Sequence, residues 1–211
     1  MSFIRIDLDK YERRRHFEYF SSLQYPYVGI TNNVDVSDLV QFCKSKDCSF
    51  YLMILHAAAL AADGVRELRQ RIRDGGIIEY SECPTSHIEL LENKTYCYCT
   101  LHHHMVLEEY IPYAEETRKK CRENGSIDED DDSDSMYFIS TLPWLHYSAM
   151  IQPVAGGEES NPRITWGKFQ EDFRGRKQLP VTLLAHHALV DGIHIAMFYQ
   201  NLEEQIKNIV N

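Results

Sequence analysis

The feature that most constrains this chain is an apolar run that ends in two histidines. Leu179–Ala185 has the length and the β-branched content of a buried strand. His186 and His187 follow it directly, and Gly192 opens a stretch of helical character that continues toward Ile209. A strand end holds an imidazole rigidly, and an imidazole can accept and return a proton at cellular pH. The run therefore predicts a strand-to-helix junction with histidine chemistry.

The same pattern has a purely structural interpretation. His186 and His187 could be core histidines whose hydrogen bonds are satisfied, beside an Asp191 that only caps the following helix. Short motifs carry this risk of a false positive. Both interpretations stay open at the level of this run alone.

Length and composition restrict the class of protein. The chain has 211 residues, of which 44% are hydrophobic, so residues 1–211 are expected to form one domain with a substantial core. A net charge of -10 argues against a nucleic-acid partner, because phosphate binding needs a concentrated cationic face. The sequence shows no signal peptide, and no segment approaches the ~20 apolar residues of a membrane span. We therefore expect a cytoplasmic protein without a membrane partner, whose six irregularly spaced cysteines are reduced thiols.

Hydrophobic periodicity predicts the remaining elements. Helices are expected at Tyr11–Phe20, Val36–Lys46, Phe50–Ala62, Val65–Arg73 and Leu107–Asn124. Strands are expected at Ile4–Leu8, Tyr27–Val34, Ile77–Tyr80, Ser86–Leu91, Tyr96–Leu101, Met136–Ser140, Leu145–Val154, Arg163–Phe169 and Gln178–Ala185. The acidic run Asp128–Asp134 predicts a solvated loop. Because helices and strands alternate without a regular β-α-β repeat, we predict an α/β fold, a two-layer sandwich of a mixed sheet with helices packed on it.

Three consecutive arginines, residues 13–15, lie in the first predicted helix. A short run of like charge is usually a solvated face. Alternatively, one of these arginines is the partner of Asp191, because an uncompensated buried carboxylate is expensive.

Several motifs together resemble the chloramphenicol acetyltransferase family. The His-His-x-x-x-Asp-Gly run at residues 186–192 resembles the active-site motif of that family and, more distantly, that of dihydrolipoamide acyltransferases. Further matching segments extend the resemblance over nearly the whole chain: Phe3–Leu8, Arg13–Glu18, Phe50–Tyr51, Leu68–Arg69, Arg73–Gly75, Leu142–Trp144 and Thr165–Phe169. The resemblance implies a chloramphenicol acetyltransferase-like fold and a single acyltransferase domain.

The resemblance also implies an activity and an assembly. The expected reaction moves an acetyl group from acetyl-CoA, a co-substrate, to a hydroxyl of chloramphenicol, a small acceptor alcohol. The expected assembly is a homotrimer with each active site at a subunit interface. His187 matches the general base, and the hydroxyl attacks the thioester directly. Asp191 paired with Arg13 would shape the turn that holds this histidine.

Five further residues match positions with roles in the family. Thr165 matches a threonine that holds an ordered water near the reaction centre. Lys168 and Phe169 lie where the family contacts the phosphate and adenine of CoA, and Phe20 and Tyr96 match aromatic lining of the acceptor pocket. Taken without the resemblance, Lys168 is equally an exposed lysine and the aromatic residues are equally ordinary core.

One position departs from the family. The hydroxyl that donates to the tetrahedral oxyanion is expected at Ala149, whereas Ser148 stands one position earlier. Neighbouring strand residues face opposite sides, so Ser148 serves as this donor only if the strand slips or bulges. Losing one oxyanion donor costs on the order of 10² to 10³ in rate. Two alternatives therefore stay open: acetylation of another small hydroxylated acceptor, and a trimeric CoA-binding scaffold with little turnover.

A second constellation, Cys97, Cys99 and His102–His104, contains zinc-ligand types. Structural zinc sites, however, usually combine two separated ligand pairs, and here all candidates crowd into one segment. We therefore expect no metal site, and we interpret the histidines as marking a strand end.

Overall fold

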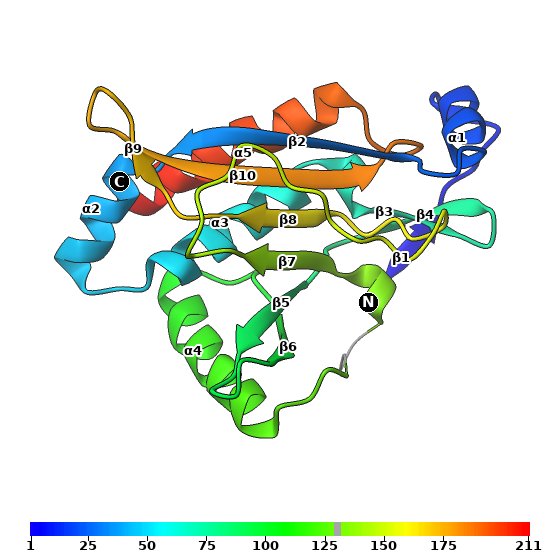
Figure 1. The fold of residues 1–211 in the computed structure, drawn as a ribbon. Coiled ribbons are helices and arrows are strands. Elements are labelled where there is room, and N and C mark those ends of the chain that lie inside the picture. Colours follow the sequence, from blue (N-terminus) through cyan, green and yellow to red (C-terminus); the bar gives the residue numbers. More distant parts are fainter. Residues whose placement is uncertain (129–131) are drawn as a thin grey trace.

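A mixed sheet forms the centre of the computed structural model, which describes residues 1–128 and 132–211 (Figure 1). Its strand order is β2-β10-β8-β7-β5-β6, with β9 paired to the start of β10. The strands are β2 (Tyr27–Asp35), β5 (Thr85–Leu90), β6 (Tyr96–Leu101), β7 (Tyr137–Thr141), β8 (Arg163–Trp166), β9 (Gln170–Glu171) and β10 (Lys177–His186). The β5, β7 and β8 strands are parallel to one another, and β10 runs antiparallel to β8.

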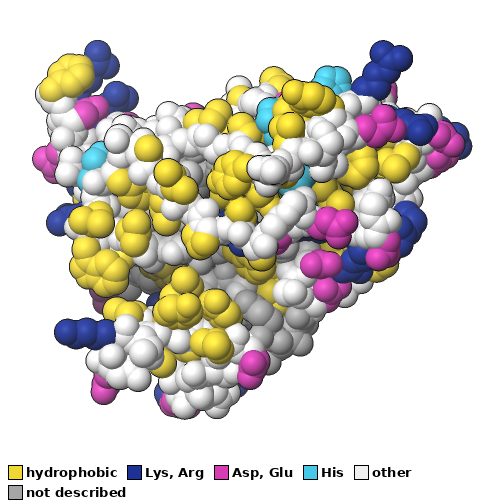
Figure 2. All heavy atoms as spheres, turned by 45° about the vertical axis from the view of Figure 1, so that its right-hand side comes forward, with side chains coloured by type: hydrophobic (Ala, Val, Ile, Leu, Met, Phe, Trp, Pro, Cys, Tyr) yellow, Lys and Arg dark blue, Asp and Glu magenta, His cyan; other side chains and the backbone are white. Residues whose placement is uncertain are grey.

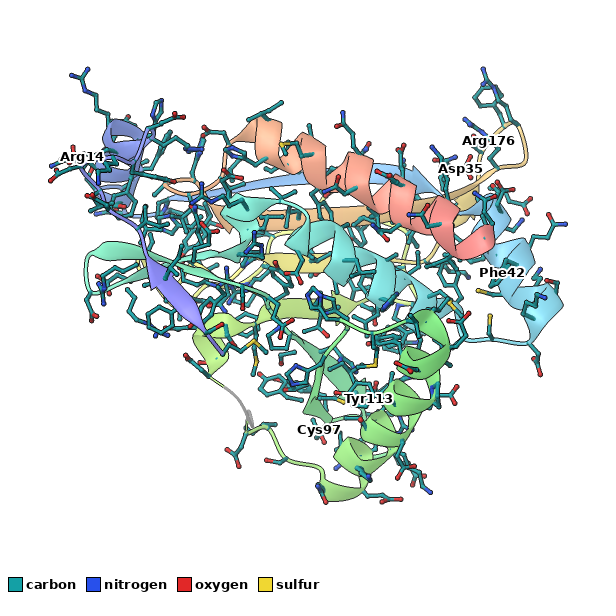
Figure 3. All side chains as sticks on the ribbon, turned by 180° about the vertical axis from the view of Figure 1, so that it is seen from behind. Arg14, Asp35, Phe42, Cys97, Tyr113 and Arg176 are labelled. Carbon is teal, nitrogen blue, oxygen red and sulfur yellow. The ribbon has the colours of Figure 1, made fainter. Side chains whose placement is uncertain are left out.

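Helices cover one face of this sheet. The helices are α1 (Arg14–Ser21), α2 (Ser37–Lys46), α3 (Phe50–Asp63), α4 (Leu107–Asn124) and α5 (Gly192–Val210). Figure 3, seen from behind, shows α3 and α5 side by side on the sheet. The predicted two-layer α/β sandwich on a mixed sheet is confirmed. No helix in the described part of the chain is long and apolar enough to cross a membrane.

The strand that ends in the two histidines occupies a central position in the sheet. From Leu179 to His186 every residue of β10 is buried, because β2 and β8 flank it and helices or loops cover its two faces. This explains why its sequence is continuously apolar instead of alternating. The Tyr199 hydroxyl of α5 lies 2.7 Å from the carbonyl oxygen of Val181, which fixes the helix against this strand.

The α3 helix forms as predicted. The backbone N–H of Leu52 donates to the Ser49 hydroxyl at 3.3 Å, so Ser49 caps the helix. Ten of the residues from Leu52 to Ala62 are buried, which agrees with a helix that is apolar nearly all round.

One predicted helix is wrong. Over Val65–Arg73 the structure has a 3₁₀ helix, η1 (Arg66–Arg69), followed by β3 (Gln70–Arg73). The β3 strand pairs with β4 (Gly76–Tyr80) across a turn at Asp74 and Gly75, which have φ values of 53° and 67°, and β4 in turn pairs with β1 (Phe3–Arg5). Two consecutive positive φ values favour a tight hairpin. Pairing in this small second sheet outweighed the helical periodicity.

The predicted strand Leu145–Val154 is also wrong. Residues 142–162 form no strand and pass in front of the large sheet as an irregular segment (Figure 1). The backbone N–H of Lys168 donates to the carbonyl of Leu145 at 2.7 Å, which holds the start of this segment against the sheet. The approach requires Gly167, because a Cβ there would lie 2.5 Å from the Leu145 carbonyl oxygen.

Two other expectations concern the acidic run and the cysteines. The η2 turn (Ser133–Ser135) occupies the end of the acidic run, whose residues 129–131 lie outside the described residues. All six cysteines are free thiols, as expected.

Candidate active site

The chain turns sharply after β10. The carbonyl of His186 accepts hydrogen bonds from the backbone N–H groups of Leu189 and Val190, both at 3.0 Å. The backbone N–H of His187 donates to the carbonyl of Pro26, the residue before β2, at 2.7 Å. The turn is therefore fixed both internally and to the neighbouring strand.

The two histidines use their rings differently. His186 is 1% exposed. Its Nε2 donates to the carbonyl of Gly157 at 2.8 Å, and its Nδ1 accepts from the backbone N–H of Ala188 at 3.2 Å. Burial lowers the pKa of this imidazole, which keeps it neutral. The structural interpretation thus fits His186, whose ring nitrogens are both occupied.

The His187 ring leaves one nitrogen available. Its Nδ1 lies 3.0 Å from the carbonyl oxygen of Val190 and 3.2 Å from Oδ1 of Asp191. A carbonyl can only accept, so Nδ1 carries the proton and Nε2 presents a lone pair. The ring stacks on Phe20 of α1, with centroids 3.8 Å apart and planes at 17°, and its side chain is 29% exposed. His187 is therefore a fixed imidazole with an accessible basic nitrogen.

An ion pair between Arg13 and Asp191 holds the turn that follows β10. Nη1 of Arg13, just before α1, lies 2.9 Å from Oδ2 of Asp191, and the Arg13 side chain is only 16% exposed. The other two arginines of the run are exposed, and Arg14 pairs with Glu18 on its own helix. The structure therefore brings Arg13, and not its neighbours, to Asp191.

His194 completes this arrangement, although the sequence did not single it out. Its Nδ1 accepts from the backbone N–H of Asp191 at 2.9 Å and lies 3.3 Å from Nη1 of Arg13. Burial lowers the pKa of His194, which favours the neutral ring that can accept at Nδ1. Its position three residues after the helix-capping Asp191 was the signal that could have identified it.

Thr165 lies elsewhere, within the sheet on β8. It is buried and pairs across the strands with Thr182 of β10. Gln152, from the irregular segment, donates through Nε2 to the Thr165 hydroxyl, while Gln152 Oε1 is buried without a hydrogen-bond partner among the described residues. Sequence reasoning missed Gln152, because nothing in the pattern indicated that this segment would fold over β8.

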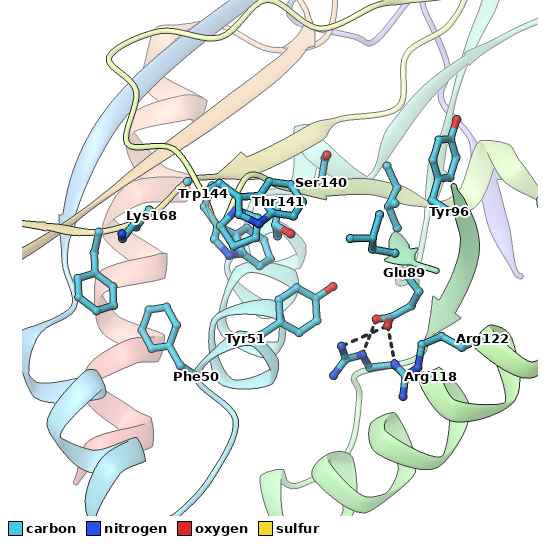
Figure 4. Close-up of a pocket in the computed structure, with 16 residues that line it drawn as sticks. Phe50, Tyr51, Glu89, Tyr96, Arg118, Arg122, Ser140, Thr141, Trp144 and Lys168 are labelled. Atoms are coloured by element: carbon cyan, nitrogen blue, oxygen red, sulfur yellow. Dashed lines mark hydrogen bonds and ion pairs between the residues drawn. The ribbon is translucent and has the colours of Figure 1, made fainter. Parts of the chain in front are cut away.

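Lys168, Phe169 and Tyr96 line one cleft of about 670 Å³ (Figure 4). The rings of Phe169 and Phe50 meet edge to face, with centroids 5.8 Å apart. Lys168 is exposed and forms no ion pair in the part of the chain that the structure describes. The cleft therefore combines aromatic surface with an available cation.

A buried carboxylate lies beside this cleft (Figure 4). Arg122 donates to Glu89 at 2.6 Å, Arg118 also donates to it, and His87 Nε2 lies 3.2 Å from it. Burial opposes ionisation of Glu89, but the hydrogen bonds from His87 and the arginines outweigh it and lower its pKa to about 2. Because Glu89 stays ionised, it compensates much of the arginine charge and leaves Lys168 as the unpaired cation.

The predicted site residues fall into two groups at opposite ends of the sheet. The β8 strand is antiparallel to β10, and Thr165 stands opposite Thr182, five residues before His187. At roughly 3.3 Å per strand residue, His187 lies about 17 Å along the strand from Thr165. Tyr96 and Lys168 lie at the far end, and His187 lines none of the cavities of about 670, 530 and 440 Å³ found in the described residues. Within one chain, His187, Phe20, Asp191 and Arg13 are together, whereas Thr165, Lys168, Phe169 and Tyr96 are not with them.

Ser148 and Ala149 are both exposed in the irregular segment. Since this segment is not a strand, the argument that neighbouring residues face opposite sides does not apply to Ser148 and Ala149.

The cysteines and histidines that the sequence offered as zinc ligands do not lie together in the structure. Figure 3 places Cys97 at the side of α4, where its thiol approaches the carbonyl of Cys121, and His103 and His104 contact Asp63 instead.

The chain is similar to known proteins over nearly its whole length. The family model described as chloramphenicol acetyltransferase matches residues 1–203. Chloramphenicol acetyltransferase 2 of Escherichia coli is 25% identical over 213 residues, covering 100% of both chains. A solved chloramphenicol acetyltransferase has a TM-score of 0.84 at 24% identity, covering 97% of this chain and 100% of its own. A dihydrolipoamide acetyltransferase structure from Azotobacter vinelandii has a TM-score of 0.70 at 17% identity, covering 92% of this chain and 86% of its own.

The ion pair behind the turn makes a direct prediction. Arg13→Ala leaves Asp191 without its cation, and we expect a loss of about 1–3 kcal/mol in the free energy of unfolding. Chemical denaturation measures this loss. Arg15→Ala, which removes an exposed arginine from the same run, is the matched control and should change stability little. Equal stability of the two variants would mean that the Arg13 pair contributes nothing.

Proposed function

Because the chain belongs to the chloramphenicol acetyltransferase family, and is therefore a CoA-dependent acetyltransferase, we propose that it transfers the acetyl group of acetyl-CoA to a hydroxyl of chloramphenicol. The observation that carries the proposal is the His187 ring, with Nδ1 held by the Val190 carbonyl and Nε2 available. The residues 1–211 act as one acyltransferase domain of a cytoplasmic protein.

The proposed reaction needs an imidazole base and no metal. Nε2 of His187 takes the proton from the acceptor hydroxyl, and the oxygen attacks the thioester carbonyl of acetyl-CoA. The tetrahedral adduct collapses with loss of the CoA thiolate, which receives the proton back from Nε2. Asp191 and Arg13 act as positioning residues, because they hold the turn that aims the ring.

The site is proposed to form between two chains of a homotrimer. The supporting observation is that His187 and Thr165 of one chain lie about 17 Å apart along the strand. Large apolar side chains also remain exposed, including Trp144, Leu145 and Ile151 at 65%, 57% and 92%. On the face shown in Figure 2, hydrophobic side chains occupy much of the middle and charged ones lie mostly toward the edges. Such surface is typical of an interface.

The cleft of Lys168 and Phe169 is the proposed acetyl-CoA site. An unpaired lysine suits a phosphate group, and the aromatic side chains that line the cleft suit the adenine ring. The 670 Å³ volume lies within the usual range of ligand pockets.

The neighbouring cavity of about 440 Å³ is the proposed acceptor site. Tyr96, Phe138 and Met150 provide apolar walls, and Gln152 provides a polar group. The Gln152 Oε1, buried without a partner among the described residues, calls for a hydrogen-bond donor on the acceptor or on a water held with Thr165. Phe20, stacked on His187, would close this site from the adjacent chain.

A second candidate is acetylation of another small hydroxylated acceptor. It is favoured by Ala149, which lacks the hydroxyl expected for the oxyanion. Ser148 is the proposed replacement donor, since the irregular backbone allows either residue to turn toward the cavity. A scaffold with little turnover is the third possibility that the experiment below distinguishes.

The function is tested by thiol release from acetyl-CoA with and without chloramphenicol. His187→Ala should lower chloramphenicol-dependent release by about 10²- to 10⁴-fold, the usual contribution of a general base. His16→Ala, an exposed histidine on α1, is the control and should retain full activity.

Three outcomes separate the candidates. Release that depends on chloramphenicol and disappears in His187→Ala supports the proposal. Release only with other hydroxylated compounds supports the second candidate. CoA binding without release from any acceptor favours the scaffold, and retained activity in His187→Ala would exclude this residue as the base.

The acceptor cavity makes a separate prediction. Gln152→Met keeps the side-chain length but removes the amide, so acceptor kcat/KM should fall by roughly 2- to 10-fold, the value of one hydrogen bond. The KM for acetyl-CoA should not change. Gln178→Met makes the same substitution at the start of β10 and serves as the control. Equal acceptor kinetics in both variants would remove Gln152 from the acceptor site.

A further inference from the structure

A second cluster of ligand-type side chains involves none of the proposed catalytic residues. Asp63 ends α3, and His103 and His104 lie in the loop between β6 and α4. Nε2 of His103 and Nε2 of His104 lie 2.8 Å and 2.6 Å from the same oxygen, Oδ2 of Asp63. One atom of each residue lies within 4.8 Å of the others, so the three can reach a common point.

The charge of Asp63 is not balanced by a permanent cation. Its side chain is 8% exposed, and no ion pair joins it to a lysine or arginine within residues 1–128 and 132–211. An ionised carboxylate that is buried needs a compensating positive charge nearby. A bound cation would supply that charge.

A cavity gives access to this cluster. It measures about 200 Å³, and its lining includes Glu82, His103 and His104. Oε2 of Glu82 lies 3.6 Å from Nε2 of His104, so a second carboxylate stands within reach. The Tyr137 hydroxyl donates to the other oxygen of Asp63 at 2.7 Å, which orients the carboxylate as an outer partner orients a metal ligand.

We propose that Asp63, His103 and His104 bind one divalent transition-metal ion of the Zn²⁺ type, with Glu82 as the fourth ligand. Two imidazoles and two carboxylates form a donor set that suits tetrahedral zinc. Metal bonds of about 2.0–2.2 Å require ligand atoms roughly 3.3 Å apart. Each imidazole Nε2 therefore has to move away from Oδ2 of Asp63 by less than about 1 Å. The half-exposed His104 has room for this movement.

The ion would tie together three segments that are distant in sequence. Asp63 is 40 residues from His103, and Glu82 belongs to the connection between β4 and β5. The sequence-based expectation of no metal considered Cys97 and Cys99 as ligands. In the structure, the carboxylates of Asp63 and Glu82, from other elements, lie near His103 and His104 instead. The proposed role is structural, since it joins the end of a core helix to two surface connections.

The test uses the full chain, stripped of metal with a chelator and titrated with Zn²⁺ by calorimetry. We expect one ion per chain and a higher Tm with the ion present. His104→Gln should weaken binding at least about tenfold, because even outer partners of metal ligands contribute 10- to 100-fold. Asp63→Asn should do the same. His16→Gln, at an exposed histidine of α1 that does not line this cavity, is the matched control and should bind as the parent does.

The absorption spectrum of bound Co²⁺ distinguishes binding at this cluster from binding at the cysteine thiols. Binding at the cluster should give the absorption of tetrahedral cobalt with nitrogen and oxygen ligands, without a sulfur charge-transfer band. Such a band, no binding, or equal affinity in His104→Gln and the parent chain would overturn the proposal. His104 is 46% exposed, so this variant folds and keeps the test decisive even if Asp63→Asn does not.

Discussion

The hydrogen bond from Nδ1 of His187 to the Val190 carbonyl is the interaction on which the proposed chemistry depends. It selects the tautomer in which Nε2 can take a proton, and it exists because the chain turns immediately after a buried strand. Behind this turn, Asp191 connects the ring to Arg13, and His194 receives the Asp191 backbone N–H. The strand holds the imidazole rigidly, the turn aims it, and the ion pair fixes the turn.

The antiparallel pairing of β10 with β8 determines where the other proposed site residues lie relative to His187. It places His187 at one end of the sheet and leaves the cleft of Tyr96 and Lys168 at the other. Parallel β5, β7 and β8 place their carboxyl ends together, which is where a ligand cavity is expected in an α/β sheet. A single chain thus carries both halves of the proposed active site without joining them. Assembly of identical chains is the arrangement that can bring the halves together.

Local features were predictable from the sequence, and features that depend on distant contacts were not. The strand, the turn and the following helix were predicted because the apolar run, the two histidines and Gly192 follow one another in the sequence. The 3₁₀ helix and β3 replaced a predicted helix over residues 65–73, because pairing with β4 is non-local. The role of Gln152 depends on an irregular segment that folds over β8, and the Asp63 cluster on a contact across 40 residues. Neither leaves a periodic signal.

The most direct test of the central claim, an active site shared between chains, is complementation. His187→Ala and Lys168→Glu each disable a different half of the proposed site, and Lys168 is exposed, so both variants should fold. When the two are co-expressed and assemble at random, a site is intact only if its His187 half comes from a Lys168→Glu chain and its Lys168 half comes from a His187→Ala chain. Acetyl-CoA turnover should then recover to about one quarter of the parent value. A mixture no more active than the average of the two separate variants would contradict the account.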